Sequence, residues 1–174
     1  MKATKKPTAQ QIAEAAREAM WAQDKASRAL GMKITRVGPG RATMRMAVRP
    51  KMCNGHLICH GGMIFALADS AFAFACNSHN RVTVANNCTI SFLAPAREGD
   101  VLFAEAVERH RGGRSGVYDV TITNQDAQII ALFRGHSTQV TGELVPGLTP
   151  EPAGRPGVPA RRTGRLRYVR ARAH

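Results

Sequence analysis

Residues 59–76, CHGGMIFALADSAFAFAC, constrain the fold of this chain more than any other stretch. After the pair Gly61-Gly62 the chain runs for more than a dozen residues with one charge, Asp69, and without Pro or further Gly. Ala, Met, Leu and Phe favour a helix, and the run is longer than a typical strand. Because apolar residues cover nearly the whole circumference, the stretch predicts a helix that is buried on most sides.

Two polar features of this helix point to chemistry. Desolvating an ionised carboxylate such as Asp69 is costly unless a partner or a reaction uses it. A helix that begins at Gly61 also presents free N–H groups to whatever lies in front of it. The two residues are eight positions apart, which is about 12 Å along a helix. They therefore cannot touch one reacting carbon within one chain, and either they are unrelated or two copies of the helix meet antiparallel across a two-fold axis.

The rest of the chain predicts an α+β domain. A helix is expected before the first strand, and strands are expected on both sides of the long helix, so we expect a curved antiparallel sheet wrapped around that helix. The expected N-terminal helix covers residues 8–30, and the expected strands cover residues 32–37, 42–48, 82–92, 101–109, 117–124 and 129–140.

Charge and proline separate the ends from the domain. Residues 146–174 hold seven Arg and one Glu, and residues 1–6 hold three Lys, so most of the net charge of +13 belongs to the ends. We expect a basic N-terminal extension over 1–8, one domain over 9–142 and a disordered Pro/Arg-rich tail over 143–174.

Two patterns bear on the compartment. The chain has no apolar run of about 20 residues and no apolar stretch behind its N-terminal charges, so neither a membrane span nor a signal peptide is expected. Four Cys in 174 residues are too few for a disulfide scaffold, which favours a reducing compartment, the cytoplasm.

A cluster of soft ligands precedes the long helix: Cys53, His56, Cys59 and His60. Their spacing fits no closed zinc site, so we expect no bound metal. A Cys nucleophile with a His base is not supported either, because neighbours in sequence are not neighbours in space.

A glycine-rich turn at residues 111–116 (RGGRSG) separates two expected strands. Its N–H groups and Arg side chains suit a phosphate. An ordinary β-turn explains the same composition, and the pattern alone does not decide between the two.

Several blocks together resemble the hotdog-fold acyl-CoA thioesterases, most closely those of the phenylacetic-acid-degradation (PaaI) type. The resemblance covers about residues 10–142, and its strength comes from the order and spacing of the blocks rather than from HGG alone. The blocks are NGH at 54–56, HGGM at 60–63, ADS at 68–70, CTISFLAP at 88–95, GD at 99–100, SGVYDV at 115–120 and FRGHS at 133–137.

The resemblance implies a hotdog fold and hydrolysis of an acyl-CoA thioester, often an aryl one. It also implies a homodimer with shared active sites, commonly assembled into a tetramer. The Gly61 N–H would polarise the thioester carbonyl, Asp69 of the other chain would act as base or nucleophile, and Asn54 and His60 would shape the site. No cofactor is implied, since coenzyme A is part of the substrate.

Two further implications concern substrate binding. Coenzyme A carries phosphates, for which the turn residues Arg111 and Arg114 are the expected partners. Gly62, Ser115 and Gly116 are also expected to bind the substrate or its coenzyme A. Some relatives hold the attacking water with a hydroxyl on the strand after the helix. This chain has Ala85 at that place, so the resemblance does not say what holds the water.

Two alternatives differ in kind from hydrolysis. A hotdog hydratase or dehydratase needs a His and an acid placed together on one substrate, and the interval to Asp69 fits a thioesterase better. A non-catalytic acyl-CoA sensor that binds DNA through the basic tail needs a folded DNA-binding module, for which residues 146–174 are too short and too rich in Pro. We therefore expect no nucleic-acid partner.

Overall fold

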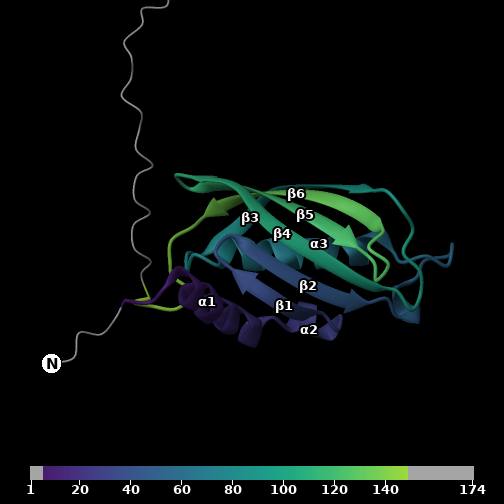
Figure 1. Ribbon diagram of the computed structural model, residues 1–174, viewed down its shortest axis with the longest axis horizontal. Helices are drawn as coiled ribbons and strands as arrows, with labels where there is room; N and C mark the ends of the chain where they lie inside the picture. Colours follow the sequence, from purple (N-terminus) through teal and green to yellow (C-terminus); the bar gives the residue numbers. More distant parts are fainter. Residues whose placement is uncertain (1–5, 149–174) are drawn as a thin grey trace, which may run out of the picture.

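The computed structural model describes residues 6–148, in which a single six-stranded sheet curves over one long helix (Figure 1). Two shorter helices precede the first strand. In chain order the elements are α1 (Ala9–Gln23), α2 (Lys25–Ala29), β1 (Lys33–Gly38), β2 (Arg41–Ala47), the 3₁₀ helix η1 (Pro50–Met52), α3 (Gly61–Asn77), β3 (Thr83–Phe92), β4 (Val101–Gly112), β5 (Ser115–Thr123) and β6 (Ile129–Gln139).

All neighbouring strands pair antiparallel, in the order β1-β2-β4-β5-β6-β3. The strand that follows α3 therefore crosses to the far edge, and β1 and β3 form the two edges of the sheet. The predicted α+β class, with a long helix wrapped by an antiparallel sheet and preceded by a helix, is confirmed.

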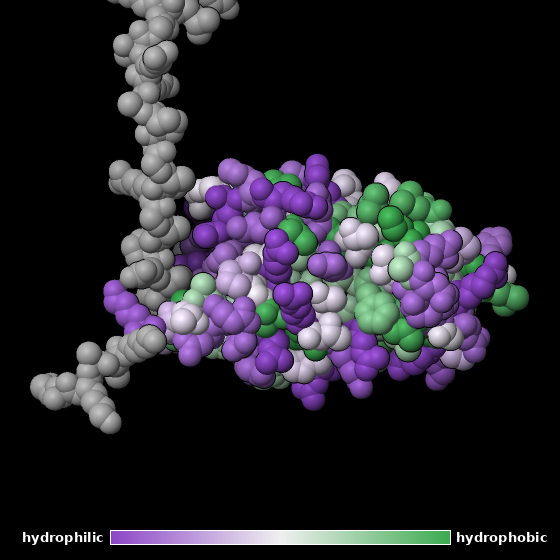
Figure 2. All heavy atoms as spheres, viewed as in Figure 1, coloured by the Kyte–Doolittle hydropathy of each residue, from purple (hydrophilic) through white to green (hydrophobic). Residues whose placement is uncertain are grey.

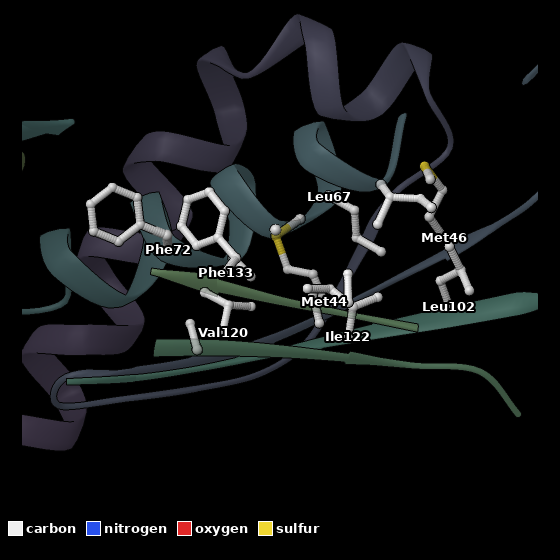
Figure 3. Packing of buried hydrophobic residues seen from close by; sticks show 14 of the residues in the cluster. Met44, Met46, Leu67, Phe72, Leu102, Val120, Ile122 and Phe133 are labelled. Carbon is white, nitrogen blue, oxygen red and sulfur yellow. The ribbon is translucent and has the colours of Figure 1, made fainter. Parts of the chain in front are cut away.

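The core lies between α3 and the sheet. Leu67 and Phe72 of α3 are buried against inward-facing side chains of β2, β5 and β6 such as Met44, Ile122 and Phe133 (Figure 3). Alternation along β2 follows from the two-residue period of a strand. The predicted burial of the long helix is thus confirmed, although its Asp69 is only partly buried.

Two local predictions were wrong. The helix expected over 8–30 is interrupted at Asp24, which ends α1 and caps α2 by accepting a hydrogen bond from the Ser27 N–H at 2.9 Å. The glycine-rich turn is shorter than expected, because β4 continues to Gly112 and β5 begins at Ser115. Only two residues form the turn, and the first, Gly113, has φ +57°, which glycine adopts without strain.

Residues 143–148, expected to belong to the tail, are bonded to the domain. Asn80 is fully buried and donates to the carbonyls of Val145 (2.9 Å) and Leu148 (2.6 Å), while its Oδ1 accepts from the Val145 N–H at 2.8 Å. The rest of the expected tail and residues 1–5 of the expected N-terminal extension lie outside the described residues. None of the helices among the described residues is long and apolar enough to cross a membrane.

Candidate active site

The start of α3 leaves one backbone donor available. The N–H groups of Met63 and Ile64 bond the His60 carbonyl at 2.8 and 3.4 Å, and the Gly62 N–H bonds His60 Nδ1 at 2.9 Å. The Gly61 N–H has no hydrogen-bond partner anywhere in residues 6–148. It therefore remains able to donate to a ligand, at the positive end of the helix dipole.

His60 positions this helix start. Its backbone is extended (φ −60°, ψ 132°), and its own N–H is bonded to the Met52 carbonyl at 2.8 Å. Because Nδ1 accepts the Gly62 N–H, the neutral ring carries its proton on Nε2. His60 thus acts as the N-cap of α3, and the N–H of Gly62, which was expected to bind substrate, is used in this cap.

Asn54 lies in the hairpin between η1 and α3. Its backbone N–H bonds the Ile58 carbonyl at 2.9 Å, and its Oδ1 accepts from the His56 N–H at 2.9 Å. The side-chain amide group makes no hydrogen bond within the described chain, so it can still donate to a ligand. The hairpin returns directly to His60, which brings Asn54 to the same end of the molecule as Gly61.

Asp69 lies two turns further along α3, in the same uninterrupted helix as Gly61. Burial raises the pKa of its carboxyl group above the ordinary value. Burial and, to a smaller extent, the charge of Asp69 raise the pKa of the Cys76 and Cys88 thiols. No hydrogen bond or ion pair to the Asp69 carboxylate occurs among the described residues. A partly desolvated carboxylate without a partner is a basic, reactive group.

Phe92 is a neighbour of the site that sequence reasoning missed. A Cβ added at Gly61 would lie 2.9 Å from Phe92 Cζ, so the tip of the ring covers the first residue of α3 and would have to shift to admit a larger residue. The ring is 52% exposed although it lies on the inner side of β3. A Phe in an alternating strand predicts a core residue, and nothing in the sequence indicates a contact across 31 positions.

The hairpin residues expected to bind coenzyme A lie at the opposite end of α3. Arg114 Nε donates to the Gln139 carbonyl at 3.0 Å, and Arg111 Nε is 3.6 Å from Glu108 Oε1. Together with Ser115, Gly116 and the end of α3, these residues line a narrow cavity of about 20 Å³. A space of that size holds a single water. One chain therefore does not bring this hairpin to Gly61.

A polar network that the sequence did not indicate fixes this far end of α3. Glu108 Oε2 accepts from the Tyr118 hydroxyl at 2.7 Å and lies 2.8 Å from His79 Nε2. Burial alone would raise the pKa of Glu108, but the hydrogen bonds from His79 and Tyr118 hold it at about 2. Burial and the bond to Glu108 raise the pKa of Tyr118. The carboxylate is satisfied within the chain, which distinguishes it from Asp69.

Among the soft ligands before α3, two are paired across the hairpin. Cys53 and Cys59 lie opposite each other in an isolated antiparallel bridge. In residues 6–148 no group of three or more His, Cys, Asp or Glu side chains is arranged to hold a metal ion.

The comparisons with known proteins agree with this geometry. The family model described as "Thioesterase superfamily" matches residues 56–131. The acyl-coenzyme A thioesterase PaaI of Escherichia coli is 48% identical over 126 residues, which are 72% of this chain and 90% of that protein.

Solved structures show the same relationship. The structure of the E. coli PaaI protein from the phenylacetic acid degradation operon matches with a TM-score of 0.77 and 45% identity, over 78% of this chain and 99% of that one. A Streptococcus mutans protein bound to acetyl CoA matches with a TM-score of 0.62 and 28% identity, over 64% of this chain and 90% of that one. The predicted hotdog fold is confirmed, and the chain belongs to the thioesterase superfamily.

Proposed function

We propose that this protein hydrolyses acyl-CoA thioesters to the free acid and coenzyme A, with aryl acyl groups of the phenylacetyl or hydroxyphenylacetyl type as its substrates. The observation that carries the proposal is the unused Gly61 N–H on the same helix as the unpartnered, partly buried Asp69. The name of the E. coli relative and its operon support an aryl acyl group in the substrate. The acetyl CoA bound to the S. mutans relative supports coenzyme A as the thiol part of the substrate. No cofactor takes part, since coenzyme A belongs to the substrate.

The Gly61 N–H and the Asp69 carboxylate have different roles in the reaction. A hydrogen bond from Gly61 N–H to the thioester oxygen strengthens as negative charge develops there, so it stabilises the transition state more than the substrate. Asp69, as base, takes a proton from the attacking water, or, as nucleophile, attacks the carbonyl itself and forms an anhydride that water then hydrolyses. In both cases the C–S bond breaks and coenzyme A leaves as a thiolate, which takes up a proton. Asn54 and His60 support the carbonyl site, Asn54 with its amide donors and His60 by capping α3.

The spacing of the two groups leads to a homodimer. Along α3 they are separated by about 12 Å, so the Asp69 that serves one Gly61 must come from a second copy. The edge strand β3 is suited to the contact: it is ten residues long, carries no charged residue and exposes Val84 and Phe92. A long uncharged edge is a template for pairing with another strand.

The same dimer gives the distant hairpin a role. If Gly61 of one copy faces Asp69 of the other, the antiparallel helices are related by an axis near Phe65. The second copy's α3 then extends about 12 Å beyond the first copy's Gly61. The hairpin at the end of that helix therefore places its Arg111, Arg114, Ser115 and Gly116 beside the first copy's site. These residues would meet the phosphates of an extended coenzyme A, on the outside of their narrow cavity. Gly62 contributes indirectly, because its N–H bonds His60 Nδ1 and so fixes the start of α3.

The proposal extends to assembly and location. Two dimers form a homotetramer, and exposed apolar side chains at the start of β6, Ile129 and Leu132, provide further contact area. Figure 2 shows apolar residues gathered at one end of the face in view. Hydrolysis takes place in the cytoplasm, where the four cysteines, free in this structure, are reduced in the resting protein.

A hydrolysis screen tests the substrate class. Wild-type protein is given aryl, short-chain and long-chain acyl-CoAs, and released thiol is measured, with Asp69→Asn as the inactive control. We expect kcat/KM to be highest for arylacetyl-CoA. Higher values for long-chain acyl-CoA would overturn the aryl assignment. No thiol release above an enzyme-free blank on any substrate would overturn hydrolysis itself, whereas equal rates for wild type and Asp69→Asn would overturn only the role of Asp69.

A further inference from the structure

We propose that Cys53 and Cys59 are a disulfide-forming pair, and that their oxidation locks the hairpin carrying Asn54 onto the start of α3. Neither is in a disulfide in this structure. Each thiol makes a long contact with a backbone carbonyl, Cys53 with Arg49 at 3.9 Å and Cys59 with His60 at 3.8 Å, and both sulfur atoms must turn away from these contacts to bond each other. The pair closes the loop immediately before the helix N-cap, so a bond here would act on the segment that holds the proposed active-site residues.

The backbone places the two residues in a favourable register. They are partners in an antiparallel bridge. The flanking hydrogen bonds run from Asn54 N–H to the Ile58 carbonyl at 2.9 Å and from His60 N–H to the Met52 carbonyl at 2.8 Å. Bonds on either side of a pair, rather than within it, identify the closely spaced, non-hydrogen-bonded position, with Cα atoms about 4.5 Å apart.

That separation lies within the range that disulfides span, about 4.4–6.8 Å between Cα atoms. Directly opposite residues also point their side chains to the same face of the ladder. The sulfur atoms can therefore be joined without separating the strands or moving Asn54, which makes this a site that accepts the bond in its native conformation.

The order of reaction follows from exposure. Cys53 is partly exposed, whereas Cys59 is buried. The Cys53 thiolate attacks one sulfur of a small disulfide such as oxidised glutathione, forms a mixed disulfide and releases one glutathione thiolate. The Cys59 thiolate then attacks the Cys53 sulfur and expels the second glutathione, so the two protein thiols are oxidised and one small disulfide is reduced to two thiols.

The closing step is expected to be slow at neutral pH. Burial, with a smaller effect of Cys53, raises the pKa of Cys59 to about 11, so its thiolate is scarce. The bond thus forms under sustained oxidation or at higher pH, and the reduced pair is the resting state.

Cys76 and Cys88 are the competing pair. One lies on α3 and the other on β3, without the register that a bridge provides. The contact of the Cys76 thiol with the Ala73 carbonyl, 3.4 Å, is also shorter than those of Cys53 and Cys59. Replacing both gives the variant Cys76→Ala/Cys88→Ser, in which only the proposed pair remains.

The test uses the full-length protein incubated with oxidised glutathione at about pH 8.5. Trypsin releases residues 52–81 as one peptide, and in the double variant we expect its mass to fall by two hydrogen atoms. In wild-type protein this peptide also holds Cys76, so the same loss counts only where fragmentation places the bond between Cys53 and Cys59; that result guards against a double variant that folds poorly. We also expect Tm to rise by about 5 °C, because the bond restricts the unfolded chain, while kcat changes less than twofold.

Two results would overturn the proposal. One is a stable glutathione adduct on Cys53 in the double variant, which would show that Cys59 cannot reach it. The other is a closed bond with an unchanged or lowered Tm, which would show that the native hairpin is strained by it. Cys59→Ser is the matched control and should give the adduct without the rise in Tm. Neither mass nor Tm depends on whether the protein hydrolyses acyl-CoA.

Discussion

At the scale of residues, Gly61 and Phe92 compete for the space in front of α3. We expect Gly61→Ala to lower kcat by about tenfold even though it keeps its N–H, because the new Cβ would lie 2.9 Å from Phe92 Cζ, so that the ring must shift and the start of α3 is misplaced. Adding Phe92→Leu should restore most of the activity by making room. Steady-state kinetics of the two variants measures both effects.

The variant Gly61→Pro separates the effect of losing the N–H donor from the effect of crowding the Phe92 ring. Proline is tolerated at the first position of a helix but lacks the N–H, so we expect a loss in kcat of about a hundredfold or more, which Phe92→Leu does not restore. A folded Gly61→Pro protein with near-normal kcat would show that the carbonyl is held elsewhere.

Asp69 is expected to lower the Tm of the protein while it raises kcat. Asp69→Asn should lower kcat at least about a hundredfold with little change in KM, because the base is lost while binding is kept. The same variant should have a higher Tm at pH 7, since burial that raises the pKa of Asp69 means that the folded state disfavours the charge. Glu98→Gln, which changes an exposed carboxylate, is the matched control and should alter neither quantity.

The pH dependence of kcat follows from the raised pKa of Asp69. A base must be ionised to act, so activity falls as pH decreases through the pKa of Asp69, and the acid limb of the kcat profile should lie above the ordinary value of 3.8. The Tm advantage of Asp69→Asn should shrink over the same pH range, because protonated Asp69 is as neutral as Asn. An acid limb at or below 3.8 would contradict the assignment.

The sequence was informative about residues whose role follows from local spacing. Gly61 and Asp69 were identified from one uninterrupted helix, and the structure places both in it. The contact of Phe92 with Gly61 and the use of the Gly62 N–H by His60 were not predicted. The first is a contact between distant segments, and the second depends on a rotamer, and neither leaves a pattern in the sequence.

At the scale of elements, the long helix and the strands were predictable from apolar runs and alternation, whereas their ends were not. Asp24 divides the first helix because its carboxylate caps the second, although the helical pattern runs through it. The segment 143–148 was assigned to the tail by composition. A single side chain, Asn80, makes it part of the domain.

Asn80 leads to a prediction about truncation. A chain ending at residue 148 should keep the fold, Tm and kcat of the full protein. A chain ending at residue 142 removes three hydrogen bonds from a fully buried amide and should lose about 1–3 kcal/mol of unfolding free energy. Urea denaturation of both chains measures the difference, and equal stability would show that Asn80 finds other partners.

At the scale of the whole molecule, the two edges of the sheet differ in a way that favours one dimer. Edge strand β1 carries Lys33 and Arg36, is interrupted by a register shift after Ile34 and is flanked by α1, from which Gln10 bonds the Val37 carbonyl. These are the usual protections of an edge. Strand β3 lacks charge along its whole length. Pairing through β3 would also place the two α3 helices side by side.

The last prediction follows from that arrangement, with each active site built from both chains. Asp69→Asn and Gly61→Pro are each inactive alone, but in a heterodimer one site collects both defects and the other collects none. Random subunit exchange makes about half of the dimers mixed, so a mixture of the two proteins should recover about a quarter of the wild-type rate. Light scattering and circular dichroism confirm that the Pro variant is folded and dimeric, and heterodimers are verified by two affinity tags. If verified heterodimers stay inactive while both parent proteins are folded, Gly61 and Asp69 do not meet across the dimer, and the antiparallel pairing of α3 must be replaced.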